Sequence, residues 1–225
     1  MTNNIKVKVC GMNDVHNLRS LLQVPIDFVG FIFYEKSSRC CKLDRRQVKA
    51  IWNESETEAQ KVGVFVDAPV EYVIKTAKDY NLDLVQLHGK ESLFYCEALQ
   101  EEGLKIIKAF SLDDTFCFSN TEAYKFYADY FLFDTKGLKP GGNGTKFNWE
   151  VLSKNTFSIP YFLSGGINKN DHGVIRNMNS KELFGVDINS QFEISPGMKN
   201  LEEISTFIYQ IKKPFPTKEY VNVRR

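Results

Sequence analysis

The sequence predicts an α/β protein folded as a single (β/α)8 TIM barrel, and three observations support this class. Eight short runs rich in Val, Ile and Phe recur along 225 residues, which is about 28 residues per unit and close to the roughly 30 that a strand, a helix and their loops require. Several runs are continuously apolar, as in parallel strands that are covered on both faces. Segments with helical spacing lie between the runs.

The predicted elements follow one another in regular alternation. The eight strands are expected at Ile5–Cys10, Asp27–Phe33, Lys61–Val66, Asp83–Leu87, Leu104–Ala109, Asp129–Asp134, Ile159–Leu163 and Phe184–Ile188. The clearest helices are expected at Val70–Tyr80, Ser92–Glu102 and Leu201–Lys212. Pro160 is compatible with its strand because it falls at the start of the run.

An open doubly wound sheet is the main alternative architecture, but it usually has fewer strands and often a GxGxxG turn, which is absent after Val9. No linker or change of composition divides the chain. We therefore expect one catalytic domain over residues 1–212. Residues 213–225 read as a polar C-terminal tail whose two prolines stop the last helix.

The charge balance argues against several classes of partner. With 29 basic and 28 acidic residues the net charge is +1, too little to neutralise a row of phosphates, so nucleic acid is not expected. The chain has no signal-like N-terminus and no run near the roughly 20 apolar residues of a membrane helix. We expect a cytoplasmic protein that binds a small molecule. Five cysteines without a CxxC pair indicate neither a disulfide framework nor a metal site.

Chemistry in such a barrel occurs at the carboxyl ends of the strands. The candidates there are Cys10, Arg39, His88, Asp134, Gly165, Gly166, Asp187, Asn189 and Ser190. Cys10 ends a strand and precedes Gly11, so its thiol could face the barrel mouth. A packed core cysteine is the alternative, because free cysteine is among the most buried residue types.

Asp134 ends the apolar run YFLFD and precedes a glycine-rich loop, TKGLKPGGNG. A carboxyl group at this position would be partly desolvated, and desolvation favours the protonated form that general acid catalysis needs. A loop-capping role explains the same position equally well.

Two small polar loops follow the seventh and eighth strands. Gly165 and Gly166 lie in LSGGI, and Asp187, Asn189 and Ser190 lie in GVDINS. Phosphate sites of these barrels are commonly built from the loops after these two strands. We therefore expect a phosphorylated ligand there, although two glycines by themselves usually mark a turn.

Arg39 and His88 are the remaining candidates. Arg39, in KSSRCC, could bind a substrate carboxylate with its forked guanidinium group, or it could simply be solvated. His88, in QLHG, is either a substrate contact or a hydrogen-bonded rim residue.

From about Lys6 to Lys212 the chain resembles phosphoribosylanthranilate isomerase of tryptophan biosynthesis. The stretches that carry the resemblance are KVCGM, DFVGFIFYEKSSR, KVGVFVDAPVE, DLVQLHGKES, KIIKAF, YFLFDTKGLKPGGNGTKFNW, YFLSGGIN and FGVDINSQFEISPGMK. Matches in this order over nearly the whole chain are far more specific than any single motif.

The resemblance implies an Amadori rearrangement of an aminoaldose to an aminoketose, with no metal and no organic cofactor. By analogy Asp134 is the general acid and Cys10, as thiolate, the general base. Arg39 matches the arginine that holds the anthranilate carboxylate, and Asp187 matches a carboxylate of the same pocket. The loops at Gly165–Gly166 and after Ile188 would bind the phosphate, and the protein would be a monomer or a homodimer.

The chain departs from the family pattern in three places. It has KSSR, NSQFE and GTKFNW where the family commonly has KSPR, SSGVE and GKTFDW. Gln191 in place of glycine is expected to reduce backbone freedom at the phosphate loop and to change how Asn189 and Ser190 meet the anion.

Two other functions stay open at this point. One is a related isomerase acting on the aminoaldose of histidine biosynthesis, although such relatives typically use two carboxylates where this chain has Cys10 and Asp134. The other is a catalytically silent barrel that binds a phosphorylated ligand, which the altered NSQFE loop favours.

Overall fold

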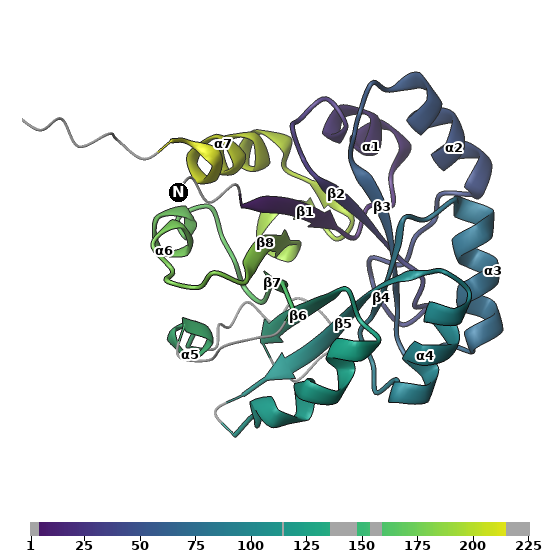
Figure 1. Cartoon of the computed structure of the whole chain (residues 1–225). Helices are drawn as coiled ribbons and strands as arrows, with labels where there is room; N and C mark the ends of the chain where they lie inside the picture. Colours follow the sequence, from purple (N-terminus) through teal and green to yellow (C-terminus); the bar gives the residue numbers. More distant parts are fainter. Residues whose placement is uncertain (1–4, 114, 136–147, 154–158, 215–225) are drawn as a thin grey trace, which may run out of the picture.

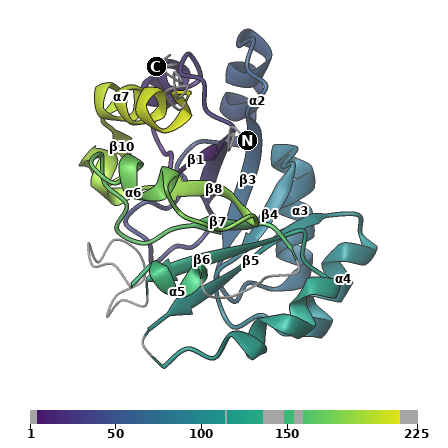
Figure 2. The same ribbon diagram turned by 60° about the vertical axis from the view of Figure 1, so that its left-hand side comes forward.

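A computed structural model describes residues 5–113, 115–135, 148–153 and 159–214. Eight parallel strands pair in sequence order and close into a barrel, with β1 beside β8 (Figure 1). Helices pack around the outside of the strands, as the turned view also shows (Figure 2). The predicted fold class is therefore confirmed.

The barrel strands are β1 (Lys6–Cys10), β2 (Phe28–Ile32), β3 (Gln60–Phe65), β4 (Leu84–Leu87), β5 (Lys105–Leu112), β6 (Tyr130–Thr135), β7 (Tyr161–Leu163) and β8 (Leu183–Ile188). The helices are α1 (Val15–Leu21), α2 (Arg45–Glu54), α3 (Val70–Tyr80), α4 (Leu93–Glu101), α5 (Glu150–Ser153), α6 (His172–Arg176) and α7 (Leu201–Lys212). All eight predicted strands are present, and α3 and α7 have the bounds that their apolar spacing predicts.

Two features differ from simple strand and helix alternation. In the described part of the β5–β6 connection, the chain forms the 3-10 segment η1 (Phe118–Phe126). After β8 a second 3-10 turn, η2 (Ser190–Phe192), leads into a small hairpin of β9 (Glu193–Ser195) and β10 (Met198–Lys199). No strands are expected there from the sequence, because segments of two or three residues are too short to show a period.

Successive side chains along each strand point alternately toward the surrounding helices and into the barrel interior. On β1, Val7 and Val9 join the large core between strands and helices, whereas Cys10 packs with Ile32 and Val64 in a separate small cluster. Lys8 lies on the same strand face as Cys10 because successive side chains point to opposite faces. That face is the barrel interior, so both residues point into it.

Three sequence expectations fall wholly or partly outside the described residues. The glycine-rich loop after Asp134 lies outside them, and so does the tail beyond residue 214. The division into a domain over 1–212 and a tail over 213–225 stays a prediction. Among the described residues, no helix is long and apolar enough to cross a membrane.

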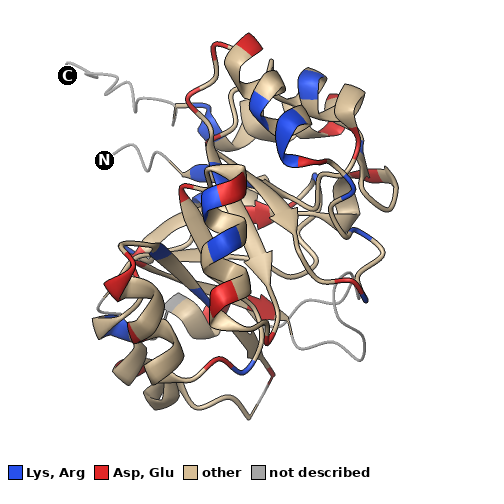
Figure 3. Ribbon diagram, turned by 90° about the vertical axis from the view of Figure 1, so that its right-hand side faces the viewer, with Lys and Arg blue, Asp and Glu red and all other residues tan. Residues whose placement is uncertain are grey.

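Charged residues of both signs are interspersed over the helices on the side of the barrel shown in Figure 3. Several form exposed pairs, such as Lys75 with Asp79 within α3. Exposed pairs of this kind contribute little to stability, because water screens them and both side chains lose freedom.

Candidate active site at the barrel mouth

The parallel strands bring the carboxyl ends of all eight to one rim of the barrel. Cys10 ends β1, Asp134 is the penultimate residue of β6, and His88 directly follows β4. Arg39 comes from the β2–α2 loop. The glycine pair follows β7, and Asn189 follows β8. All nine sequence candidates therefore lie on, or just beside, this rim.

Cys10 sits beside a buried ion pair. Lys8 Nζ lies 2.9 Å from Asp187 Oδ1, and the side chains of these two residues are 0% and 6% exposed. The register of β1 and β8 sets Lys8 directly opposite Asp187. Gly30 on the neighbouring strand leaves room for this cluster, since a Cβ there would come within 2.8 Å of the thiol sulfur and 3.1 Å of the ammonium nitrogen.

Burial and the neighbouring charges have opposing effects on the pKa of the Cys10 thiol. Burial raises the pKa of the thiol above its ordinary value, while the nearby Lys8 and Lys199 ammonium groups lower it and Asp187 raises it further. Burial also raises the pKa of Asp187, against the lowering effect of Lys8. Burial lowers the pKa of Lys8, but the Asp187 carboxylate, together with the ionised form of Cys10, raises it by more. The net effect of these groups is a raised pKa of the Cys10 thiol.

Asp134 is held in a defined orientation. Its Oδ1 accepts a hydrogen bond from the Thr135 amide at 2.8 Å, and its Oδ2 lies 3.2 Å from His88 Nε2. Asp134 is 23% exposed, so the carboxyl group is partly buried and still reachable. His88 Nδ1 in turn lies 2.8 Å from Gln86 Nε2. The donor and the acceptor in this pair are set by the tautomer of His88, whose Nε2 is the ring atom that faces Asp134.

Arg39 is mostly buried, and one edge of its guanidinium group is bound to Glu193. Its Nε lies 2.9 Å from both carboxylate oxygens of Glu193, and its Nη2 lies 2.7 Å from Glu193 Oε2. The side chain is only 12% exposed. The interpretation of Arg39 as a solvated loop residue is therefore wrong, and its partner comes from the β9–β10 hairpin.

The rim over β7 and β8 carries the residues predicted to bind phosphate. Gly165 and Gly166 both have positive φ, at +88° and +68°. A Cβ at Gly165 would collide with Thr135, so only glycine fits beside β6. No acceptor among the described residues binds the backbone N–H of either glycine.

On the other side, Asn189 and Ser190 open the η2 turn. Asn189 Oδ1 accepts a hydrogen bond from Lys199 Nζ at 2.7 Å, so that oxygen already has a cationic partner. Gln191 does not adopt a positive φ. Its backbone thus avoids the left-handed region, and its effect on how Asn189 and Ser190 meet the anion stays a prediction.

Sequence reasoning missed four residues of this site: Lys8, Gln86, Glu193 and Lys199. Two of them carried a usable signal, since Lys8 and Gln86 each stand two positions before a candidate and a strand repeats every two residues. Glu193 and Lys199 carried none, because they lie in a short hairpin and meet Arg39 only after the chain has closed the barrel.

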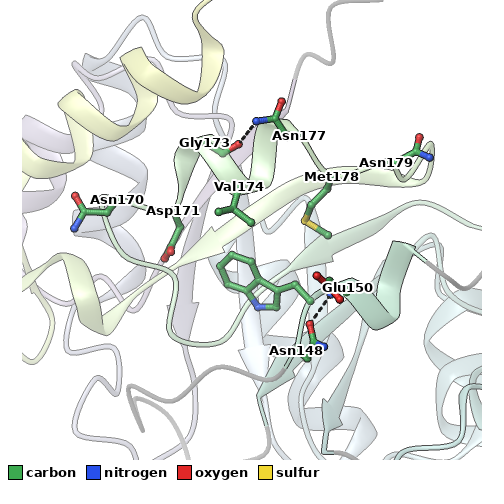
Figure 4. Close-up of a pocket in the computed structure, with 10 residues that line it drawn as sticks. Asn148, Glu150, Asn170, Asp171, Gly173, Val174, Asn177, Met178 and Asn179 are labelled. Atoms are coloured by element: carbon green, nitrogen blue, oxygen red, sulfur yellow. Dashed lines mark hydrogen bonds between the residues drawn. The ribbon is translucent and has the colours of Figure 1, made fainter.

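A hollow lies between α5 and α6, and none of these residues lines it. It has a volume of about 960 Å³, and asparagine side chains contribute much of its wall (Figure 4). Two of its hydrogen bonds are local, from Asn177 to Gly173 and from the Glu150 amide to Asn148. The barrel mouth is the candidate active site instead, because Cys10, Asp134 and Arg39 all lie on or beside its rim.

Comparison with known proteins matches this geometry to one family. Residues 7–210 match the N-(5'-phosphoribosyl)anthranilate (PRA) isomerase family. An N-(5'-phosphoribosyl)anthranilate isomerase of Parabacteroides distasonis is 40% identical over 208 residues, which cover 92% of this chain and 94% of that protein.

Two crystal structures agree with the sequence comparison. The phosphoribosyl anthranilate isomerase of Thermotoga maritima superposes with a TM-score of 0.81 at 30% identity, over 92% of this chain and 98% of the other. A phosphoribosyl anthranilate isomerase in complex with reduced 1-(o-carboxyphenylamino)-1-deoxyribulose 5-phosphate has a TM-score of 0.76 and 27% identity, with the same coverage.

Proposed function

The chain belongs to the N-(5'-phosphoribosyl)anthranilate isomerase family, and from this membership we propose how its own residues carry out the reaction. The protein is an aldose–ketose isomerase of tryptophan biosynthesis. It converts N-(5-phosphoribosyl)anthranilate into 1-(2-carboxyphenylamino)-1-deoxyribulose 5-phosphate. The arrangement that supports the proposed roles is the position of Cys10 at the end of β1 and of Asp134 near the end of β6, on one barrel mouth.

Asp134 is the general acid of the proposed mechanism. It donates a proton to the ribose ring oxygen, so that the C1–O bond breaks and the nitrogen lone pair forms an iminium ion. The amide of Thr135 and the imidazole of His88 orient its carboxyl group toward the mouth. His88 is also a wall of the substrate site in this proposal.

Cys10 is the general base. Its thiolate removes the proton from C2 of the iminium ion, and the electron pair left behind forms an enolamine that tautomerises to the ketose. Because burial raises the pKa of the thiol, the reactive thiolate is a minor form at neutral pH and increases as the pH rises. Lys8 and Lys199 oppose this burial effect and stabilise the thiolate.

In this proposal the protein binds the substrate at its two anionic groups, the anthranilate carboxylate and the phosphate. Arg39 binds the anthranilate carboxylate through the guanidinium edge that Glu193 leaves open. Backbone N–H groups of Gly165 and Gly166, with the Asn189–Ser190 turn, bind the phosphate. Asp187 supports this site indirectly by holding Lys8 beside Cys10.

Two substitutions test the assignment. Cys10→Ala and Asp134→Asn are each expected to lower kcat by about 10²–10⁴-fold, the usual contribution of a positioned acid or base. The measurement is steady-state turnover of N-(5-phosphoribosyl)anthranilate as a function of pH. In the unaltered enzyme, kcat/KM should rise with pH as the Cys10 thiol ionises.

Cys117→Ala serves as the matched control, because this thiol is exposed and has no role in the proposed mechanism. It should keep full activity. If Cys10→Ala or Asp134→Asn also keeps full turnover while folded, that residue is not the acid or base.

A cytoplasmic location and a monomeric or homodimeric state belong to the same proposal. Size-exclusion chromatography with light scattering distinguishes the two oligomeric states.

A further inference from the structure

Three charged side chains form one buried cluster beside Cys10. Glu193 accepts from Arg39 on one side, and on the other from Lys199 Nζ at 2.7 Å and from the Gly197 amide at 3.0 Å. The Glu193 and Lys199 side chains are 4% and 0% exposed. We call Arg39, Glu193 and Lys199 the mouth cluster.

The mouth cluster is locked by several contacts. Lys199 Nζ also donates to Asn189 Oδ1, and the Lys199 amide donates to the buried side chain of Asn17 on α1. Burial would raise the pKa of Glu193, but Arg39, Lys199 and the Gly197 amide together lower it. These contacts therefore favour the ionised carboxylate of Glu193.

The cluster carries an excess positive charge. Arg39 and Lys199 supply two cations, and both form ion pairs with the single carboxylate of Glu193. Lys199 donates to two acceptor oxygens, as expected of an ammonium group. One unit of positive charge is thus available to a ligand anion at this part of the rim.

Glu193 also decides which edge of Arg39 faces a ligand. A guanidinium group has five N–H donors in a plane, and Glu193 occupies the edge formed by Nε and Nη2. The edge formed by Nη1 and the second N–H of Nη2 keeps its donors, apart from a 3.5 Å contact with Ser38 Oγ. That edge matches a planar carboxylate.

Gly11 places this edge next to the reacting strand. It has a φ of +82°, and a Cβ there would lie 3.1 Å from Arg39 Cδ and 3.1 Å from Asn189 Oδ1. The absence of a side chain lets the stem of Arg39 pass directly over the turn that follows Cys10. The mouth cluster therefore lies against the turn that directly follows Cys10, the proposed base.

We propose that Glu193, anchored by Lys199, is a positioning residue that makes Arg39 select substrates bearing a carboxylate on the ring attached to the amine. The proposal rests on the proposed function, in which Arg39 binds that carboxylate. Positioning and simple charge balance predict opposite results when Glu193 is neutralised. Neutralisation raises the cluster charge to +2, which by itself would tighten binding of an anion.

The experiment compares Glu193→Gln with the unaltered enzyme on two substrates. One is N-(5-phosphoribosyl)anthranilate, and the other is N-(5-phosphoribosyl)aniline, which lacks the carboxylate. We expect the KM for the anthranilate substrate to rise about 10-fold to 100-fold, as for other losses of orientation at a site. The kcat should stay close to its original value, and the KM for the aniline substrate should not change.

Matched variants separate the possible causes. Glu203→Gln removes a carboxylate from an exposed ion pair with Lys169 and should change neither KM. Arg39→Lys keeps the charge but loses the fork, so it should raise the anthranilate KM like Glu193→Gln, and the double variant should be no worse than either. Glu193→Asp provides a second test if Glu193→Gln does not fold, with the same direction expected.

The outcomes distinguish the two proposals. If Arg39→Lys raises the anthranilate KM while Glu193→Gln lowers it or leaves it unchanged, Glu193 only balances charge and the inference is wrong. If Arg39→Lys changes the KM of both substrates equally or of neither, Arg39 does not bind the carboxylate, and that part of the proposed function fails as well.

Discussion

Gln86, His88 and Asp134 form a chain of side chains that ends on the proposed acid. Gln86 is 1% exposed and points into the barrel. Its Nε2 contacts His88, while its Oε1 has no partner among the described residues. A buried amide with one unsatisfied oxygen is costly, so the position is better explained by its effect on His88 than by packing.

We therefore expect Gln86→Leu to lower kcat by about 10-fold, less than the loss of the acid itself. Without the Gln86 amide, His88 loses the contact at Nδ1 that fixes its tautomer, and its present hydrogen bond to Asp134 becomes one of two alternatives. The measurement is kcat and KM at several pH values, together with thermal unfolding to confirm that the variant is folded.

The matched control is Gln100→Leu, which alters an exposed amide on α4. It should leave kcat unchanged. A Gln86→Leu enzyme with normal kcat would show that the orientation of His88 does not affect the acid.

At the scale of elements, Asp27 connects the first strand of the barrel with the last helix, α7. It directly precedes β2 and accepts hydrogen bonds from Lys6 Nζ and the Val7 amide on β1, and from Lys212 Nζ at the end of α7. The final helix is thereby tied to the first strand. These partners lower the pKa of Asp27 even though its burial alone would raise it.

This gives a pH-dependent prediction for stability. A lowered pKa in the folded state means that Asp27 stabilises the fold above its unfolded pKa of about 3.9, and that this contribution is lost as the pH falls through the lower folded value. We expect Asp27→Asn to reduce the free energy of unfolding by about 1–2 kcal/mol at pH 7. The difference from the unaltered protein should shrink below pH 4.

Urea unfolding at both pH values measures this difference. Glu56→Gln, which alters an exposed carboxylate, should have little effect at either pH. An Asp27→Asn difference that stays constant down to acid pH would contradict a role for the ionised carboxylate.

At the scale of the whole molecule, aromatic rings close the end of the barrel opposite the mouth. The rings of Phe28, Tyr130, Phe162 and Phe184 contact one another at centroid distances of 4.8–6.1 Å. Most of them stand at the beginning of their strands, which places them at the amino-terminal end. This end serves stability, since the chemistry is at the other.

Phe162→Ala is expected to lower the free energy of unfolding by about 3–5 kcal/mol, because the ring is fully buried and its loss leaves a cavity. The KM of the remaining folded enzyme should be unchanged. Denaturant unfolding and steady-state kinetics on the same preparation provide the two measurements.

The control is Phe94→Ala, since that ring is 81% exposed, and we expect no comparable loss. If both substitutions have the same effect on stability, the ring cluster is not a structural core.

Much of this molecule follows from local sequence. Apolar runs of strand length, separated by amphipathic segments, determine β1 to β8 and helices such as α3 and α7. The parallel arrangement then places Cys10 and Asp134 at one rim, because the carboxyl ends of all strands in a closed parallel barrel meet there. The sequence determined these features because strand and helix periods are local.

The tertiary structure alone decided which charges meet. Lys8 pairs with Asp187 across 179 positions, and Arg39 pairs with Glu193 across 154. Neither pair can be predicted from a local pattern. The first pair depends on the closure of β1 against β8, and the second depends on the hairpin that follows β8. Closure brings the first and last strands of the barrel together, and only then do these buried charges acquire their partners.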